Sequence, residues 1–202
     1  MKIRGFAFAL AAVSVLTQPA AAYDSPMFEE SHARSVFAFG GALTRGNMHQ
    51  SAVAPGVGYE RNVVVGLGFQ QFPFERGQFA LGWEIGGAGR FGGGVTGELW
   101  GGAVLRHKGF AVAPDYRLGT AMTVGLSHIS STHRGREQEL EARYGGNART
   151  LFYLGPELSL SSTDAPEREI FWRLHHRSGG GRTLGNMYGA ANANVIGLRY
   201  RF

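Results

Sequence analysis

The sequence has no cysteine, few charged residues and no long apolar run. The absence of cysteine among its 202 residues excludes a fold held together by disulfides. Charged residues make up 17% and aromatic residues 12%, whereas disordered chains are rich in charge and poor in aromatic side chains. The main apolar run, residues 6–16, is shorter than the roughly 20 residues of a membrane-spanning helix. We therefore expect a folded chain without disulfides or spanning helices.

The apolar run belongs to an N-terminal pattern typical of export. Lys2 and Arg4 precede it, and small residues follow it at 20–22. A basic stretch, a short apolar core and a small-residue cleavage site together form a secretory signal peptide. We therefore expect residues 1–22 to be a signal peptide and residues 23–202 to form a single exported domain.

Apolar and polar residues alternate through most of the remaining chain, which is the pattern of β-strands. Val63, Val65 and Leu67, for example, share one face, while Gly66 and Gly68 lie on the other. Counting such segments gives eight expected strands, at 35–45, 62–72, 78–89, 97–107, 111–127, 149–160, 168–178 and 191–202.

The polar rows of these strands distinguish a soluble sandwich from a membrane barrel. A sandwich would bury the apolar rows, whereas a small membrane barrel turns them toward lipid and packs small and charged groups inside. A narrow lumen needs glycine, and charges of opposite sign can pair there. The polar rows combine glycine with charges of both signs, at Glu84, Arg106, Asp115, Arg117, Glu157 and Arg173. The sequence therefore predicts an all-β fold, an eight-stranded antiparallel transmembrane β-barrel.

The expected connections alternate in length, which indicates an orientation. With both termini in the periplasm, the outward connections at 46–61, 128–148 and 179–190 are long and the one at 90–96 is short. The expected periplasmic turns, near 75–77, 107–109 and 161–167, are all short. This asymmetry is typical of bacterial outer-membrane barrels. The net charge of +5 suits anionic phosphates, and export favours outer-membrane lipid over nucleic acid as the partner.

Polar residues interrupt the lipid-facing rows at the outer end of the last two strands. Alternation places His176 and Ser178 on the lipid-facing row of one strand, and Asn192 and Asn194 beside them on the next. Polar groups are costly at this depth. A serine near an imidazole is the minimum for an activated nucleophile, and a third polar group can orient the imidazole. The alternative interpretation is that these residues merely end the strands in the membrane interface.

The His-x-Ser of the penultimate strand, the Gly-rich loop after it and a last strand ending in Tyr-x-Phe resemble the outer-membrane lipid A 3-O-deacylase (PagL) family. The specific part of this resemblance covers residues 176–202. It implies an esterase that removes the 3-O-linked acyl chain of lipid A in lipopolysaccharide, with its active face toward the outer leaflet. It also implies that Ser178 is the nucleophile and His176 its base.

The chain departs from the family pattern at two positions. The family's glutamate on the last strand has no acidic counterpart, and its place falls to Asn192 or, as an alternative, Asn194. The asparagine that follows the serine in the family is Gly179 here, which offers an oxyanion only its backbone N–H.

Two functions stay open at this point, a lipid A esterase and a non-catalytic surface or structural barrel. Neither requires a cofactor or a metal, and His128 and His133 lie in a polar loop without further converging ligands. The charged segment 134–143 is expected to be an exposed loop. The oligomeric state is left open, with a homodimer as one option.

Overall fold

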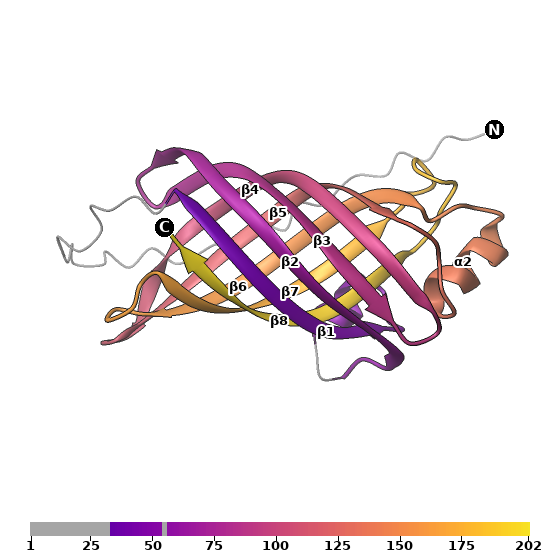
Figure 1. The fold of residues 1–202 in the computed structure, drawn as a ribbon, viewed down its shortest axis with the longest axis horizontal. Coiled ribbons are helices and arrows are strands. Elements are labelled where there is room, and N and C mark those ends of the chain that lie inside the picture. Colours follow the sequence, from indigo (N-terminus) through magenta and orange to yellow (C-terminus); the bar gives the residue numbers. More distant parts are fainter. Residues whose placement is uncertain (1–32, 54–55) are drawn as a thin grey trace, which may run out of the picture. The chain divides into compact units, whose positions relative to one another are not determined.

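The computed structural model describes residues 33–53 and 56–202, so the expected signal peptide, residues 1–22, lies outside the described residues. The described residues form a closed barrel of eight antiparallel strands (Figure 1). Each strand pairs with its neighbour in sequence, and β8 closes the barrel against β1 through pairs that run from Ser35–Arg201 to Thr44–Asn192. This confirms the predicted fold class.

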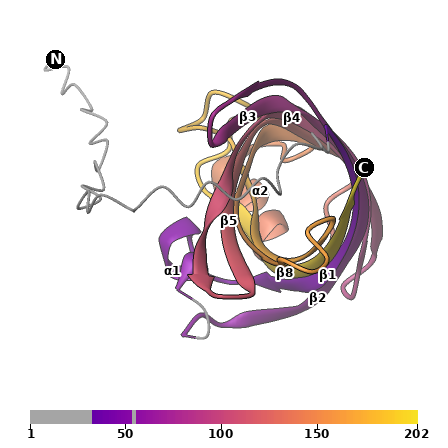
Figure 2. The same cartoon turned by 90° about the vertical axis from the view of Figure 1, so that its left-hand side faces the viewer.

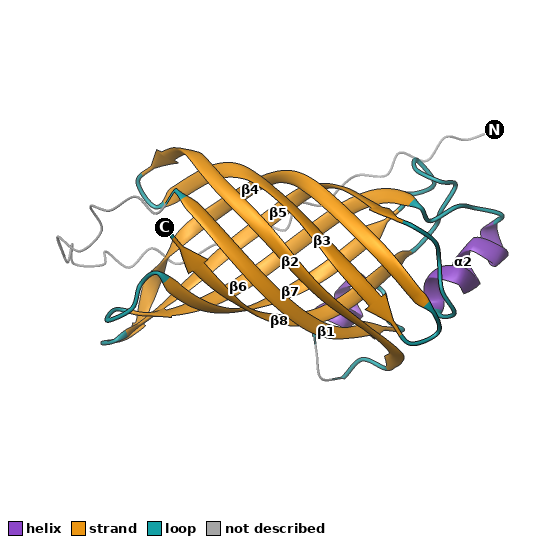
Figure 3. Cartoon of the chain, in the orientation of Figure 1, coloured by secondary structure: helices purple, strands orange, loops and turns teal. Residues whose placement is uncertain are grey.

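Strands make up most of the barrel domain, and two short helices lie in the connections at one end (Figure 3). The elements are β1 (Arg34–Thr44), α1 (Met48–Ala52), β2 (Tyr59–Arg76), β3 (Phe79–Phe91), β4 (Val95–Ala113), β5 (Tyr116–Ile129), α2 (Arg136–Tyr144), β6 (Thr150–Ser162), β7 (Arg168–Ser178) and β8 (Ala190–Arg201). Neither helix is long and apolar enough to cross a membrane.

The connections differ in length between the two ends of the barrel. The end that carries α1, α2 and residues 179–189 is called here the α2 end. At the opposite end, called the terminal end, the Arg34 N–H donates to the Phe202 carbonyl at 3.1 Å, and the connections 77–78, 114–115 and 163–167 are short. The predicted alternation of long and short connections is therefore present.

One predicted turn is wrong. The sequence suggested a turn at 107–109, but β4 continues to Ala113 and the turn lies at Pro114 and Asp115. The pairing register of β4 with β5 shifts between His107 and Phe110, and Gly109 has a φ of +101° there. Gly109 thus forms a β-bulge, which bends a strand without reversing it. As a result Asp115, expected in the lumen, is exposed in the turn.

The outer face of the barrel is a continuous apolar surface. Val63, Val65 and Leu67 are 44%, 56% and 68% exposed, while Val64 between them is buried, so the predicted faces of β2 are correct. Aromatic side chains gather at the terminal end, at Phe74, Phe79, Phe110, Tyr116, Tyr200 and Phe202. Soluble monomers rarely expose so much contiguous apolar surface. An apolar band with an aromatic border is the surface that a membrane barrel turns toward lipid.

Glycines on the lumen-facing rows make room for aromatic rings. A Cβ added to Gly68 would lie 2.1 Å from the ring of Phe37, and one added to Gly86 would lie 2.1 Å from the ring of Trp100. Both rings are buried in the lumen. The glycine in the polar rows therefore reflects close packing inside a narrow barrel, as the sequence indicated.

Buried ion pairs fill the rest of the lumen. Arg173 donates to Glu84 and to Glu157 at 2.7 Å each, and all three side chains are essentially inaccessible to solvent. Arg199 and Arg106 extend the network toward the terminal end through Glu157 and Glu169. Because a buried charge is costly unless it is paired, this network fixes how the strands pack around the lumen. Glu84, Glu157, Arg106 and Arg173 thus lie in the lumen, as predicted.

The segment 134–143 is not the exposed loop that its charge suggested. It contains most of α2, and Glu137 of that helix is buried. The Glu137 carboxylate pairs with Arg90 of β3 at 3.1 Å and also with Arg177 of β7. Viewed along the barrel from the terminal end, the ribbon of α2 lies behind the ring of strands (Figure 2). Ion pairs with two buried arginines at the end of the barrel thus account for the burial of this acidic side chain.

Candidate active site

The polar residues singled out on β7 and β8 meet on the outer face of the barrel near the α2 end. His176 is the cross-strand partner of Asn192, and Ser178 is the partner of Ala190. The intervening residues of β7, such as Arg177, belong to the lumen network, so His176 and Ser178 point outward. Both strands therefore present the faces that the sequence predicted.

A hydrogen bond joins His176 to Asn192. The distance from His176 Nδ1 to Asn192 Oδ1 is 2.6 Å. The amide orientation of Asn192 is fixed from its other side, because Nδ2 donates to the Gly46 carbonyl at 2.9 Å. Since Oδ1 only accepts hydrogen bonds, the proton of a neutral His176 must be on Nδ1. That tautomer has its lone pair on Nε2, which is the nitrogen that a general base uses in a serine hydrolase.

Ser178 lies on the same row, partly buried, two residues beyond His176. Residues two apart on a strand are separated by about 7 Å and point the same way. The Ser178 hydroxyl oxygen accepts a hydrogen bond from the Gly180 N–H at 3.3 Å. Among the residues that the structure describes, no hydrogen bond links Ser178 to His176, so a productive contact would require the two side chains to move closer together.

Gly179, the predicted oxyanion donor, occupies a tightly packed position. A Cβ on Gly179 would lie 2.3 Å from the Met187 carbonyl oxygen and 2.8 Å from that of Leu184. The Gly179 carbonyl also accepts from the Leu184 N–H at 2.9 Å. This packing explains why no asparagine can follow the serine. The backbone N–H that points at the Ser178 oxygen is that of Gly180.

Asn194, the alternative third residue, points to a different partner. Its Nδ2 donates to the Tyr59 hydroxyl at 3.3 Å, and its cross-strand neighbour on β7 is Leu174. The buried Oδ1 of Asn194 has no hydrogen-bond partner among the described residues. Of the two asparagines, Asn192 is therefore the one in contact with His176.

The connection between β1 and β2 covers the His176–Asn192 pair. His176 is 4% and Asn192 1% exposed although both face outward. The Thr44 and Ser51 hydroxyls are 2.6 Å apart and tie α1 to β1, and a capping box formed by Asn47 and Gln50 starts that helix. Sequence reasoning missed this cover. The Asn-x-x-Gln spacing was the available signal, because it marks a helix start.

Three of the other histidines, His128, His133 and His175, have partners of their own. His175 lies in the lumen, where Nε2 contacts Glu98 at 2.9 Å and Nδ1 contacts the Tyr153 hydroxyl at 3.2 Å. His128 contacts Thr150, whereas His133 contacts Thr96. Burial lowers the pKa of His133, which favours its neutral form. Within the described residues, no three His, Asp or Glu side chains are grouped as metal ligands.

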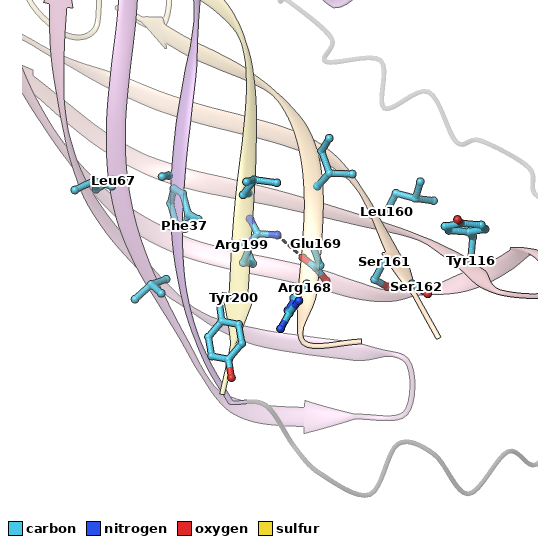
Figure 4. A pocket seen from close by; sticks show the side chains of 14 residues that line it. Phe37, Leu67, Tyr116, Leu160, Ser161, Ser162, Arg168, Glu169, Arg199 and Tyr200 are labelled. Carbon is cyan, nitrogen blue, oxygen red and sulfur yellow. Dashed lines mark hydrogen bonds and ion pairs between the residues drawn. The ribbon is translucent and has the colours of Figure 1, made fainter. Parts of the chain in front are cut away.

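Two grooves lie away from the His176–Asn192 pair. The larger, of about 640 Å³, is on the apolar outer face near the terminal end and is lined by residues such as Leu67, Ile170 and Leu198 (Figure 4). Its lining includes Ser161 and Ser162 but no histidine. The smaller, of about 460 Å³, lies at the α2 end and is lined mainly by charged residues and glycines. The larger groove is therefore not the place of the serine and histidine chemistry.

Comparisons with known proteins identify the fold. No family model and no curated protein matches the sequence. Among solved structures, the chain is similar to the outer-membrane enzyme PagL, with a TM-score of 0.56, 15% identity, and coverage of 83% of this chain and 99% of that chain. It is also similar to Neisserial surface protein A (NspA), with a TM-score of 0.51, 10% identity, and coverage of 84% of this chain and 97% of that chain. The chain thus has the eight-stranded barrel fold of bacterial outer-membrane proteins, which both an enzyme and a surface protein share.

Proposed function

We propose that this protein is an outer-membrane esterase that removes the 3-O-linked acyl chain of lipid A, with Ser178 as nucleophile and His176 as general base. The observation that carries the proposal is the hydrogen bond that His176 Nδ1 donates to Asn192 Oδ1, with the asparagine amide held in place by the Gly46 carbonyl. It selects the histidine tautomer that can accept a proton from a serine. The α2 end would face the outer leaflet, because the long connections gather there.

The reaction follows from the roles of these groups. Ser178 Oγ attacks the ester carbonyl while its proton passes to His176 Nε2. The protonated imidazole then gives that proton to the leaving sugar oxygen, which leaves an acyl-enzyme. Water, deprotonated by His176, attacks the acyl-enzyme and releases the fatty acid, and the proton returns to Ser178. Asn192 holds the imidazole orientation throughout but, unlike a carboxylate, adds no charge to stabilise the imidazolium.

The oxyanion of the tetrahedral intermediate needs hydrogen-bond donors near the nucleophile. Gly179 remains one candidate through its backbone N–H. The Gly180 N–H is the better placed, because it already donates to Ser178 Oγ at 3.3 Å. Rotation of Ser178 toward His176 would free this N–H for the substrate oxygen.

The Gly180 contact also favours the second candidate function, a non-catalytic surface barrel. A serine that accepts from the backbone two residues ahead stabilises the turn at a strand end, as serine does in many loops. In that case Ser178 would be structural and His176 would only anchor α1 through Asn192.

Mass spectrometry of lipid A separates these two functions. Cells that express the protein should yield lipid A lacking one ester-linked hydroxyacyl chain, and cells that express Ser178→Ala should not. Ser131→Ala, which removes an exposed loop serine at the same end, serves as the matched control and should retain deacylation. Unchanged lipid A from cells with folded parent protein would reject the esterase and favour the non-catalytic barrel.

A further inference from the structure

Three arginines surround the smaller groove at the α2 end. Arg45 follows β1, Arg61 belongs to β2 and Arg134 precedes α2, and all three are exposed. None of their guanidinium groups forms an ion pair with any residue that the structure describes. Glu60 and Glu139 also line the groove. However, Glu60 is already engaged, because it accepts from Asn62 Nδ2 at 2.6 Å and from the Arg136 N–H at 2.8 Å.

Asn62, which is buried, holds the walls of this groove together. Its Nδ2 donates to the Arg134 carbonyl at 2.7 Å, and its Oδ1 accepts from the Gly93 N–H at 2.7 Å. The walls also leave no room for side chains at two glycines. A Cβ on Gly92 or on Gly135 would lie 2.4 Å from an oxygen of Asn62 or Glu60, respectively. Strand β2 and two connections are thus clamped into a preformed groove of about 460 Å³.

The groove borders the candidate active site. Arg45 lies between Thr44, the cross-strand partner of Asn192, and Gly46, whose carbonyl fixes the Asn192 amide. Tyr59, which lines the groove, accepts a hydrogen bond from Asn194. A molecule in this groove would therefore lie across β1 from the His176–Asn192 pair.

We propose that this groove binds a phosphate group on the headgroup of an anionic lipid. Guanidinium groups form paired, charge-assisted hydrogen bonds with phosphate oxygens, and a phosphate has enough oxygens and charge to engage several arginines. The inference rests on the proposed function, because it assigns the phosphate to lipid A held beside Ser178. It makes Arg45, Arg61 and Arg134 determinants of substrate recognition. Free inorganic phosphate has the same chemistry and is the competing source.

Binding to the Ser178→Ala protein in detergent micelles tests the proposal without turnover. Bisphosphorylated lipid A is titrated into this protein and into the same protein carrying Arg45→Gln, Arg61→Gln and Arg134→Gln. The triple change should weaken binding by about tenfold or more, since each charge-assisted contact contributes to affinity. The matched control carries Arg34→Gln, Arg76→Gln and Arg168→Gln, three exposed arginines at the terminal end. It has the same net charge and should bind like the unmodified Ser178→Ala protein.

Two further ligands identify the source of the phosphate. Dephosphorylated lipid A should bind the Ser178→Ala protein weakly. Its affinity should match that of bisphosphorylated lipid A for the variant that also lacks Arg45, Arg61 and Arg134. Inorganic phosphate should displace lipid A only weakly. Equal binding by both triple variants, whether strong or weak, would overturn the proposal, because the groove would then contribute nothing of its own. Inorganic phosphate that binds as tightly as lipid A would overturn the lipid assignment.

Lipid A analysis in cells separates a failure of this inference from a failure of the proposed function. Arginine-dependent binding without any deacylation by the parent protein would reject the esterase alone. If the parent protein deacylated lipid A but binding did not depend on the three arginines, the groove would be rejected as the phosphate site and the esterase would stand. Without heating, a folded barrel migrates differently on an SDS gel from the heat-unfolded chain, and this difference verifies that each variant is folded.

Discussion

His175 and His176 are neighbours on β7, yet they face opposite sides of the barrel wall and have different partners. Both ring nitrogens of His175 have partners in the lumen, Glu98 and Tyr153. His176 is hydrogen-bonded through Nδ1 to Asn192, and its Nε2 has no hydrogen bond from the described part of the chain. Hydrogen bonds thus occupy both nitrogens of His175, whereas the Nε2 lone pair of His176 is not engaged by the described residues. Under the proposed function, His175 stabilises the lumen and His176 acts as the general base.

The same contrast extends to the surroundings of each histidine. The lumen residues form ion pairs that link distant strands, as Arg173 does with Glu84 across 89 positions of the sequence. On the outer face, the polar residues are few, and the connection with α1 covers them. Changes in the lumen should therefore affect stability first, and changes on the outer face should affect activity first.

Replacing each histidine in turn is the strongest test of this contrast. His176→Gln should reduce lipid A deacylation by about a thousandfold or more, because it removes the general base. His175→Gln should retain most of the activity but lower the unfolding free energy by about 1–3 kcal/mol, because Glu98 loses a buried partner. Deacylation is measured by lipid A mass spectrometry and stability by urea unfolding in lipid vesicles. If both variants lost activity in proportion to their loss of unfolding free energy, the two histidines would not have the different roles proposed for them.

Arg173 provides a test of the lumen alone. Arg173→Met should lower the unfolding free energy by about 3–5 kcal/mol, because Glu84 and Glu157 would each lose a partner in a buried site. Arg168→Met on the same strand is the matched control. That side chain is 76% exposed, and its loss should cost less than about 0.5 kcal/mol. Urea unfolding of both variants in the same vesicles measures the difference. Similar stabilities would show that the network is not what holds the lumen together.

Strand faces could be predicted from the sequence because a period of two determines which side chains share a face. The outward rows of β2, β7 and β8 and the partnership of His176 with Asn192 follow from that rule and from pairing across one loop. The position of the turn after β4 could not be predicted in the same way. Gly109 is compatible with either a turn or a bulge, and the pairing with β5 decides between them.

Contacts between residues distant in sequence explain what could not be predicted. The burial of Glu137 depends on Arg90 and Arg177, which come from β3 and β7. The β1–β2 connection that covers His176 is joined to β8 by a hydrogen bond from Asn192 Nδ2 to the Gly46 carbonyl, 146 positions apart. No local pattern encodes either contact. The residues of the candidate site were thus predictable, but the helix that covers them and the groove beside them were not.

The smallest expected effect compares the two asparagines of β8. Asn192→Ala should lower kcat by about 10- to 100-fold with little change in KM, because the imidazole loses its orientation while substrate binding is preserved. Asn194→Ala should leave kcat within about twofold, since Asn194 contacts Tyr59 and not His176. Initial rates of fatty acid release from lipid A in micelles measure both parameters.

Asn192→Asp separates a positioning role from a purely structural one. An aspartate keeps an acceptor for His176 Nδ1 and adds a charge that stabilises the imidazolium, so it should restore activity to at least the parent level. It also loses the donor to the Gly46 carbonyl, so it should be less stable by about 1 kcal/mol. Activity that rises while stability falls is an outcome that a structural anchor would not produce. Parallel losses of both in Asn192→Ala and Asn192→Asp would make Asn192 an anchor for α1 alone.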